Sequence, residues 1–413
     1  FTIPLIIRGG YRPYFAGAVE ALSSTGGQIM PPIMGAAAFV MAEITGIPYW
    51  DICKAAAFPA ILFYGSVFIM VHLEAVRTGV MGLSKEELPN LRETLRKGWF
   101  LISPIIVLVA FLVLQYTVTK ACLMAIVSTI LVFLIHRRTL DALRRMGRDL
   151  SRGARDGVRS IFREVSFVLV SLGETLDQGA KMALTVAVAC ICAGIIVGVI
   201  TLSGLGLRFS GMISALAGNY VLVALLLVAV SSIILGMGMS TTANYITVAT
   251  LAVPALYILN VNTLSAHMFA FYFSCLSMIT PPVALAAYAA AGIAQTSPWR
   301  VGFTAMRLGM VAFIIPFMYA YNPALLLIGP LSSVVRACMT AAIGVIALSA
   351  GIMGYLYHRT TWVERILLGL AGLLLIKPGF TSDLIGLPIF AVVIAWQYFT
   401  SRGKNRLCRD GEK

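Results

Sequence analysis

The stretch SSTGGQIMPPIMGAAA at residues 23–38 decides the fold, because the chain carries a second version of it, SMITPPVALAA, at residues 277–287. Aligning residues 1–55 with residues 251–305 without a gap gives ten identical pairs, and four of these pairs are prolines in register. Proline fixes φ and removes a backbone N–H donor, so each pair marks the same helix interruption built twice. The sequence therefore predicts two repeated halves, each with a broken helix.

The composition places the chain in a membrane. Of its 413 residues 59% are hydrophobic and only 12% are charged, whereas about 25% of the residues of a soluble domain are charged. One buried core cannot hide so many apolar side chains. Apolar runs recur along the chain, and we expect an all-α polytopic membrane protein with about eleven membrane segments of roughly 20 residues each.

The positive charge is concentrated in two segments. The formal net charge is +14, and residues 137–163 hold nine arginines and three aspartates, while residues 402–413 hold five basic and two acidic residues. The positive-inside rule predicts that both segments are cytoplasmic. Arginines recur at steps of three or four from Arg144 to Arg163, which favours a helix lying on the membrane surface, with a solvated basic linker as the alternative. The segment has a single aromatic residue, Phe162, so nucleic-acid binding is not expected.

A polar tip interrupts the apolar pattern of the second half. The run ending in LGMGM reaches Gly238, the sequence STTANY follows, and the next apolar piece, residues 246–259, contains Pro254. A piece of about 14 residues covers only half of a membrane, which predicts a re-entrant hairpin near residues 233–260. The offset of 250 places the partner of Gly236 before Phe1, so we expect the chain to begin inside its first hairpin.

Repeated halves with broken helices are typical of secondary transporters, which build a substrate and ion site at the interruptions. The unwound segments free backbone carbonyls and half-helix ends, and these groups can hold a cation or an anion without a charged side chain in the membrane. No H-E-x-x-H, G-x-S-x-G or G-x-x-x-x-G-K-[ST] motif occurs in the sequence. We therefore expect a transporter driven by an ion gradient and not an enzyme.

Three stretches resemble the large membrane subunit of tripartite ATP-independent periplasmic (TRAP) transporters, and more narrowly the TAXI branch, in which the small and large membrane subunits are often fused. These stretches are FTIPLIIRGGYRPYFAGAVEALSSTGGQIMPPIMGAAAFVMAEITGIPYWDI, LGMGMSTTANYITVATLAVPAL and SMITPPVALAAYAAAGIAQTSP. The resemblance continues to residue 388. It implies an elevator-type importer in the cytoplasmic membrane of a bacterium or archaeon. That importer would be coupled to Na⁺ and would receive an organic anion from a periplasmic substrate-binding protein, with a small membrane subunit that is separate or fused upstream.

The resemblance also implies site residues. The mobile transport domain would contain Ser24, Thr25, Gly26, Gln28, Pro31, Pro32, Gly236, Gly238, Thr241, Thr242, Asn244, Thr280, Pro281 and Pro282. Oxygen ligands suit a hard cation, and the expected Na⁺ ligands are carbonyls near Gly236, Gly238 and Pro281 with the hydroxyls of Thr25, Thr241 and Thr280. Amides both donate and accept, and the expected substrate contacts are Gln28 and Asn244, with Thr242, Pro31, Pro32 and Pro282 nearby. The alternative for each of these residues is that a small side chain only permits close helix packing.

Some charged residues near the membrane have local interpretations. Glu174, Asp177 and Lys181 share a helix face and are expected to pair with each other or line an interface. Glu43 is expected to lie near the end of a span. Arg307 and Arg336 either attract an anionic substrate or serve at lipid headgroups and helix ends.

The pattern divides the chain into four segments. Residues 1–78 form the later part of the first repeat, residues 79–165 scaffold helices and the basic segment, residues 166–322 the second repeat, and residues 323–413 extra membrane helices with a basic tail. Two other functions stay open at this point. The chain could be an ion-coupled carboxylate carrier that needs no binding protein, or a non-transporting truncated or accessory membrane subunit.

Overall fold

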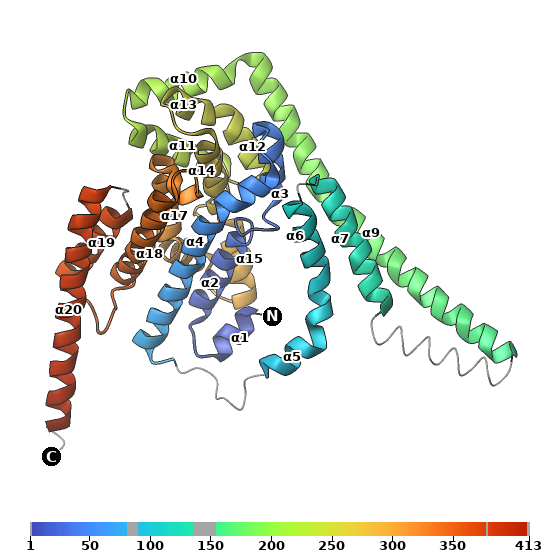
Figure 1. The fold of residues 1–413 in the computed structure, drawn as a ribbon, viewed down its shortest axis with the longest axis horizontal. Coiled ribbons are helices and arrows are strands. Elements are labelled where there is room, and N and C mark those ends of the chain that lie inside the picture. Colours follow the sequence, from blue (N-terminus) through green and yellow to red (C-terminus); the bar gives the residue numbers. More distant parts are fainter. Residues whose placement is uncertain (1, 81–89, 115, 136–153, 377–378, 411–413) are drawn as a thin grey trace. The chain divides into compact units, whose positions relative to one another are not determined.

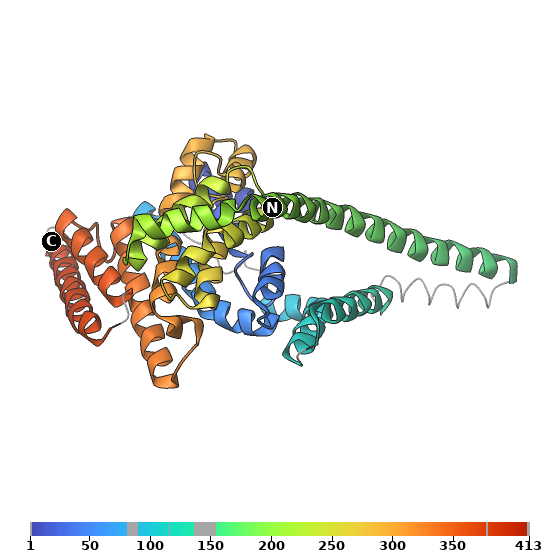
Figure 2. The ribbon, with the colours of Figure 1, turned by 90° about the horizontal axis from the view of Figure 1, so that it is seen from above.

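The computed structural model describes residues 2–80, 90–114, 116–135, 154–376 and 379–410, and within these ranges every regular element is a helix (Figure 1). The all-α class is therefore confirmed. The first helices are α1 (Thr2–Arg8), α2 (Pro13–Gly26), α3 (Ala36–Thr45), α4 (Tyr49–Thr78), α5 (Leu91–Gly98), the 3₁₀ turn η1 (Trp99–Ile102), α6 (Ser103–Val113) and α7 (Val118–Ile135). After the 50-residue α9 (Ala154–Ser203), drawn as one long helix in Figure 2, come α10 (Leu205–Ala217), α11 (Val221–Leu235), α12 (Thr241–Leu251) and α13 (Val253–Ile258). The last elements are α14 (Thr263–Leu276), α15 (Leu285–Ala294), α16 (Pro298–Leu308), α17 (Met310–Tyr321), η2 (Pro323–Leu326), α18 (Leu331–Met353), α19 (Trp362–Ile376) and α20 (Phe380–Asp410).

The chain divides into two compact units. Unit 1 comprises residues 1–47, 51–83 and 193–413, and unit 2 comprises residues 48–50 and 84–192. In unit 2, α6 packs against α7, and α5 begins at Leu91 after Asn90, whose side chain accepts a hydrogen bond from the Arg92 amide. The predicted division into four segments stays a prediction.

The repeat read from the prolines is a repeat of backbone structure. Both α2 and α14 have 14 residues and occupy equivalent positions at the offset of 250, and α3 and α15 both have 10 residues. Between the helices of each pair lies a break, residues 27–35 in the first copy and 277–284 in the second. The Pro-Pro peptide bond is cis in both copies. The prediction of two broken helices is confirmed.

The two breaks close in the same way. The Gly35 amide donates to the Gln28 carbonyl at 2.8 Å, and the Ala286 amide donates to the equivalent Met278 carbonyl at 3.0 Å. Met34 in the first break and Ala284 in the second have positive φ, 53° and 34°. A residue with a Cβ adopts this conformation at a cost of about 1–2 kcal/mol. Because both copies keep a positive φ at the equivalent residue despite this cost, the surrounding structure imposes the conformation of the break.

The two broken helices cross so that their breaks lie at the same level. The helix before the first break, α2, packs against α15, and the helix before the second break, α14, packs against α3. A Cβ added at Gly17 would lie 3.4 Å from the Ala294 Cβ. Gly17 is nine residues before the end of α2, and Ala294 is nine residues after the start of α15. The copies therefore have opposite directions, with α3 and α14 above α2 and α15 in Figure 1.

The copies differ in the helix that follows. In the first copy, α4 continues for 30 residues with Pro59 inside it. In the second copy the equivalent segment is α16 and α17, which meet at Gly309 with a bend of 40°. A Cβ at Gly309 would lie 3.1 Å from the Leu22 Cδ1 and 3.3 Å from the Ile279 Cδ1, so this bend packs tightly against α2 and the second break.

The hairpin of the second half differs in detail from the prediction. The helices α11 and α12 contact each other and are joined by a tip at residues 236–240, but TTANY belongs to α12 and not to the tip. The physical reason is Ser240, whose side chain accepts a hydrogen bond from the Ala243 amide and starts the helix at Thr241. Pro254 stands at the beginning of α13, where its missing N–H costs no hydrogen bond.

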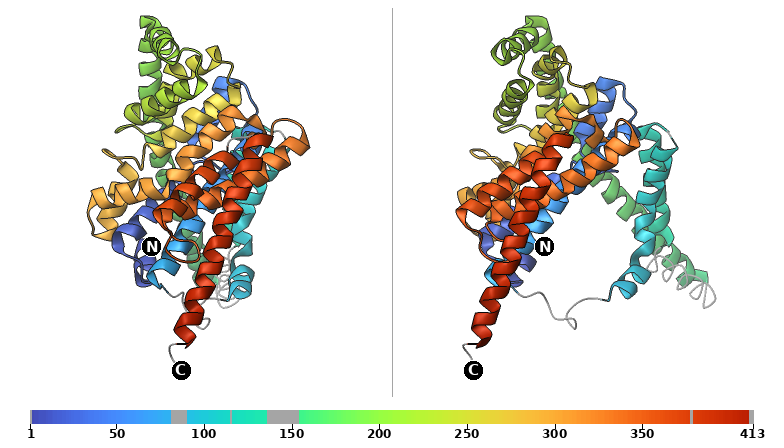
Figure 3. Two further views of the ribbon diagram at one scale, coloured as in Figure 1. Left: turned by 90° about the vertical axis from the view of Figure 1, so that its left-hand side faces the viewer. Right: turned by 60° about the vertical axis from the view of Figure 1, so that its left-hand side comes forward.

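Three helices in the described part of the chain are long and apolar enough to cross a membrane, namely Tyr49–Thr78, Leu331–Met353 and Thr381–Thr400. The number rises to five if Cys190–Ser203 with Leu205–Ala217 and Pro298–Leu308 with Met310–Tyr321 each count as one bent span. Other apolar helices in this part of the chain have 10–17 residues, and two of them, Ala36–Thr45 and Thr263–Leu276, border a break. The C-terminal helices α18, α19 and α20 lie side by side in both views of Figure 3.

The expected arginine stripe lies mostly outside the described residues. Residues 136–153 are not described, and of residues 154–163 only the helical backbone of α9 is. On the same helix, Lys181 and Asp177 form the expected exposed ion pair at 2.6 Å. Glu43 is exposed near the end of α3, and Arg336 is exposed on α18.

Candidate functional site

The hairpin tip and the second break meet at a cluster of three residues, Gly236, Asn244 and Ser277. The Asn244 side-chain amide nitrogen donates to the Ser232 carbonyl at 3.0 Å and to the Ser277 hydroxyl at 3.4 Å. The Ser277 hydroxyl in turn donates to the Ser274 carbonyl at 2.8 Å. A Cβ at Gly236 would collide with the Asn244 amide nitrogen and with the Ser277 hydroxyl. Glycine is therefore the residue that lets the tip approach the break.

The Asn244 amide oxygen is the unusual atom of this cluster. Asn244 is fully buried, and within the described part of the chain its Oδ1 has no hydrogen-bond partner. The Ser232 carbonyl can only accept, so it fixes the amide nitrogen on its own side and turns the oxygen to the other side. A buried acceptor without a donor costs about 1–3 kcal/mol. Such an atom fits a ligand position for a cation.

A second polar group holds this part of the hairpin in place. His267 on α14 lies between two tyrosines, with Tyr245 Oη 2.8 Å from its Nδ1 and Tyr257 Oη 2.6 Å from its Nε2. Tyr245 and His267 are buried. The three residues connect α12, α13 and α14, and Tyr245 is the neighbour of Asn244 in the chain. The network therefore fixes α12 against the helix that ends at the break.

The other predicted residues of the second half surround the cluster with different roles. Thr241 is buried and Thr242 half-buried in the first turn of α12, while Gly238 is exposed at the tip with φ 83°. The Thr280 hydroxyl donates to the Leu276 carbonyl at 2.8 Å. The Pro281 ring packs against Gly302 of α16, and the Pro282 carbonyl accepts from the Tyr288 hydroxyl at 2.5 Å.

The predicted residues of the first half lie around the first break. Thr25 is buried, and its hydroxyl donates to the Ala21 carbonyl at 2.8 Å. The Gln28 side chain folds over its own break, close to Gly35. Pro31 is half-buried, and the Pro32 carbonyl accepts from the Cys53 thiol at 3.7 Å. These contacts hold Thr25 at the end of α2, and they hold Gln28 and the proline pair within the first break.

Sequence reasoning missed Ser277. It stands where the first copy has Gly27, so the repeat alignment itself contained a signal, a polar residue in one copy at a position that is glycine in the other. Asn244 was predicted as a substrate contact, and this role stays a prediction for a side chain that is fully buried. Among the described residues no group of three or more His, Cys, Asp or Glu side chains could hold a metal. The candidate site is therefore neutral and built from amide, hydroxyl and backbone oxygens.

Paired broken helices with a helical hairpin between them define a class of membrane transporters. The chain belongs to the family described as tripartite ATP-independent periplasmic transporter, DctM component, whose family model matches residues 1–334. It is thus a TRAP secondary transporter subunit for organic acids and a multi-pass membrane protein. A second match, to a domain of unknown function called DUF3394, covers residues 334–394. No curated protein matches the chain.

Proposed function

We propose that the chain imports an organic anion, a carboxylate, by coupling its movement to Na⁺ across the cytoplasmic membrane. The substrate arrives from a periplasmic substrate-binding protein, and a small membrane subunit completes the transporter. The family match supports organic-acid transport, and a tripartite system requires further components. The observation that carries the sodium coupling is the buried Asn244 oxygen near the hairpin tip and the second break, which has no hydrogen-bond partner among the described residues.

The chemistry of this position favours Na⁺ over other partners. A hard monovalent cation binds to neutral oxygens, and a break supplies backbone carbonyls that no helix uses. The Asn244 oxygen and the Ser277 hydroxyl are the side-chain ligands in this proposal, with carbonyls of the tip near Gly236 and of the break near Pro281. Bound Na⁺ satisfies the orphaned acceptor and fastens the tip to the break.

The carboxylate then binds beside the ion. Thr242 and Gln28 lie at the hairpin and at the first break, and both side chains can donate to a carboxylate oxygen. A site that holds anion and cation together stays close to neutral, which lowers the cost of carrying both through the bilayer. In this proposal the helices that carry the two breaks and the hairpin move as one body, in the manner of an elevator.

The sodium site is tested by titration of the purified transporter. Thermal stability is measured against NaCl, with KCl keeping the ionic strength constant. Asn244→Ala is expected to raise the sodium midpoint about tenfold or more, because a buried ligand position contributes about 1–3 kcal/mol. Uptake in proteoliposomes with the binding protein should lose its dependence on the sodium gradient in the same variant.

The matched control is Thr247→Val. Thr247 is buried on the same helix, and its hydroxyl donates to the Ala243 carbonyl of its own turn. Its replacement should leave the sodium midpoint unchanged. If Asn244→Ala and Thr247→Val gave the same midpoint as the unmodified protein, Asn244 would be a packing residue. Uptake that proceeds equally well without the binding protein would instead identify an independent carrier.

A further inference from the structure

A basic cavity lies in unit 1 at the other end of α2 from the breaks. Its volume is about 670 Å³, and the residues of its lining that carry charge or a phenol are Tyr11, Arg12, Glu74, Arg77, Arg359 and Arg365. Since α2 has 14 residues and rises 1.5 Å per residue, the cavity is roughly 20 Å from the break. It is therefore separate from the candidate sodium site.

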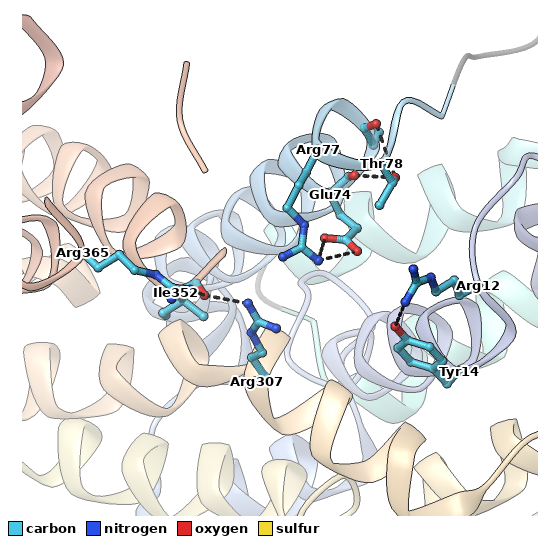
Figure 4. Close-up of polar contacts among 9 residues, drawn as sticks. Arg12, Tyr14, Glu74, Arg77, Thr78, Arg307, Ile352 and Arg365 are labelled. Atoms are coloured by element: carbon cyan, nitrogen blue, oxygen red, sulfur yellow. Dashed lines mark hydrogen bonds and ion pairs between the residues drawn. The ribbon is translucent and has the colours of Figure 1, made fainter. Parts of the chain in front are cut away.

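The cavity has more positive charge than its own acid can neutralise. Glu74 is buried and pairs with Arg77, whose Nη2 lies 2.6 Å from its Oε2 and 2.9 Å from its Oε1 (Figure 4). Arg12 donates to the Tyr14 hydroxyl at 3.3 Å, and neither Arg12 nor Arg359 forms an ion pair with another described residue. Four arginines against one glutamate leave a net charge of +3 around this space.

Two neighbouring arginines donate hydrogen bonds to backbone carbonyls at the C-terminal end of α18. The Arg307 Nη2 donates to the Ile352 carbonyl at 2.9 Å (Figure 4). Arg365 donates to the Gly351 and Ile352 carbonyls at 3.2 and 3.3 Å. These carbonyls belong to the last turn of α18, where the helix dipole attracts cations. The helix-end role considered for Arg307 is thus observed. Arg12 and Arg359 are the two exposed arginines of the cavity lining, so they have the greatest freedom to bind a ligand.

Two polar hydroxyls complete the lining. The Thr360 hydroxyl is buried and has no hydrogen-bond partner among the described residues. Burial and the charge of Glu74 both raise the pKa of Tyr11, so its phenol stays protonated and can donate. Both groups are donors suited to an anion.

The C-terminal tail indicates which side of the membrane this cavity faces. The His358 amide donates to Gln397 of α20 at 3.2 Å, and Gln397 donates to Glu364 of α19 at 2.9 Å. The basic tail starts at Arg402, five residues after Gln397 along α20, so it lies at the same end of unit 1 as the cavity. By the positive-inside rule this end is cytoplasmic.

Large aromatic residues near the cavity are exposed, with Trp362 77% and Trp299 53% accessible, as at a membrane interface.

We propose that this cavity binds an anionic phosphate group, and that its aromatic surroundings favour the headgroup of an acidic phospholipid of the cytoplasmic leaflet over a soluble phosphate. Arginine forks match phosphate oxygens in pairs. Arg12 and Arg77 come from the part of the chain that matches the transporter family, whereas Arg359 and Arg365 come from the DUF3394 segment. The DUF3394 segment thus contributes half of a phosphate site that links it to the first repeat.

The test uses the delipidated full-length transporter in detergent. Phosphatidylglycerol is expected to raise the melting temperature, phosphatidylcholine is not, and 10 mM inorganic phosphate gives the soluble-anion arm. The double variant Arg12→Gln/Arg359→Gln should lower the apparent affinity for phosphatidylglycerol at least about tenfold, since each charge-assisted hydrogen bond contributes strongly to binding. Arg208→Gln is the matched control, because Arg208 is an exposed arginine on α10 outside the cavity lining.

The outcomes separate the possible ligands. Stabilisation by phosphatidylglycerol alone that is lost in the double variant supports the lipid site. Equal stabilisation by inorganic phosphate, lost in the same variant, supports the phosphate site and assigns it to soluble compounds. Equal stabilisation by phosphatidylcholine, or the same response in the double variant and in Arg208→Gln, overturns the proposal. None of these readouts depends on Na⁺ coupling, so failure here leaves the proposed function untouched.

Discussion

The first and second breaks have the same backbone and different chemistry. Both follow a 14-residue helix, both contain a Pro-Pro pair, and both close through an amide that donates to the residue at position 28 or 278. The first copy has Gly27 where the second has Ser277. In the second copy this serine joins Asn244 and Gly236. Repetition thus supplies the interruption, and a few local side chains decide what the interruption binds.

The comparison also explains why the second copy is the better candidate for a cation. Its hairpin tip contacts the break through Gly236, and the buried Asn244 amide oxygen beside it has no donor among the described residues. Around the first break, Thr25 and Tyr64 donate to backbone carbonyls of α2. Three substitutions test this difference between the copies.

The largest effect is expected from Gly236→Ala. A Cβ at this position would collide with the Asn244 amide and lie 2.7 Å from the Ser277 Cβ, so the tip must move away from the break. Overpacking of this kind costs about 1–3 kcal/mol, and sodium-dependent uptake should fall to background. The control is Gly211→Ala on α10, where a Cβ meets nothing within 4 Å. A Gly236→Ala protein with a normal sodium midpoint would separate the tip from the ion site.

An intermediate effect is expected when the second copy is made like the first by Ser277→Gly. This change removes the hydroxyl that accepts from Asn244 and donates to Ser274. The sodium midpoint should rise about five- to tenfold, which corresponds to the roughly 1 kcal/mol of one buried hydrogen bond. Ser277→Ala should give a similar midpoint, because it removes the same hydroxyl without adding the backbone freedom of glycine. A difference between the two variants would assign the effect to the backbone instead.

The smallest effect is expected from the reciprocal change, Gly27→Ser. Gly27 is exposed, and a Cβ there would lie 3.2 Å from the Ser24 carbonyl oxygen and 3.8 Å from the Tyr64 hydroxyl. We expect a loss of less than about 1 kcal/mol in stability and a sodium midpoint within twofold of the unmodified protein, both measured in the same titration. A shift as large as that of Ser277→Gly would show that the two breaks are equivalent in ion binding.

Much of the fold could be predicted from the sequence, because proline changes the backbone at its own position in the chain. Each Pro-Pro pair removes two successive backbone donors, so the positions of both breaks could be predicted, whereas the single Pro59 stands inside the continuous helix α4. The end of the tip could not be predicted as well, because the start of α12 depends on one side-chain hydrogen bond from the Ala243 amide to Ser240. Helix ends in general depend on such single contacts.

The sequence predicted which segments form the candidate site, but not which side chains contact one another within it. The sequence indicated Gly236, Asn244 and the second break as parts of one site, and the structure brings them together. It could not indicate that Ser232 holds the Asn244 amide nitrogen while the amide oxygen has no partner in the described part of the chain, because these residues meet only when α11 folds back against α12. The basic cavity was equally hidden, since Arg12, Arg77 and Arg365 are distant in the chain.

The sequence by itself determined that this protein is helical, lies in a membrane and is built from two copies of a broken helix. Hydrophobicity, charge and proline act through local backbone and solvent physics, so they can be read without coordinates. Only the tertiary structure decided which polar groups face one another and which stay unpaired. That outcome depends on the packing of helices far apart in the chain, and a fixed repeat offset does not specify such contacts.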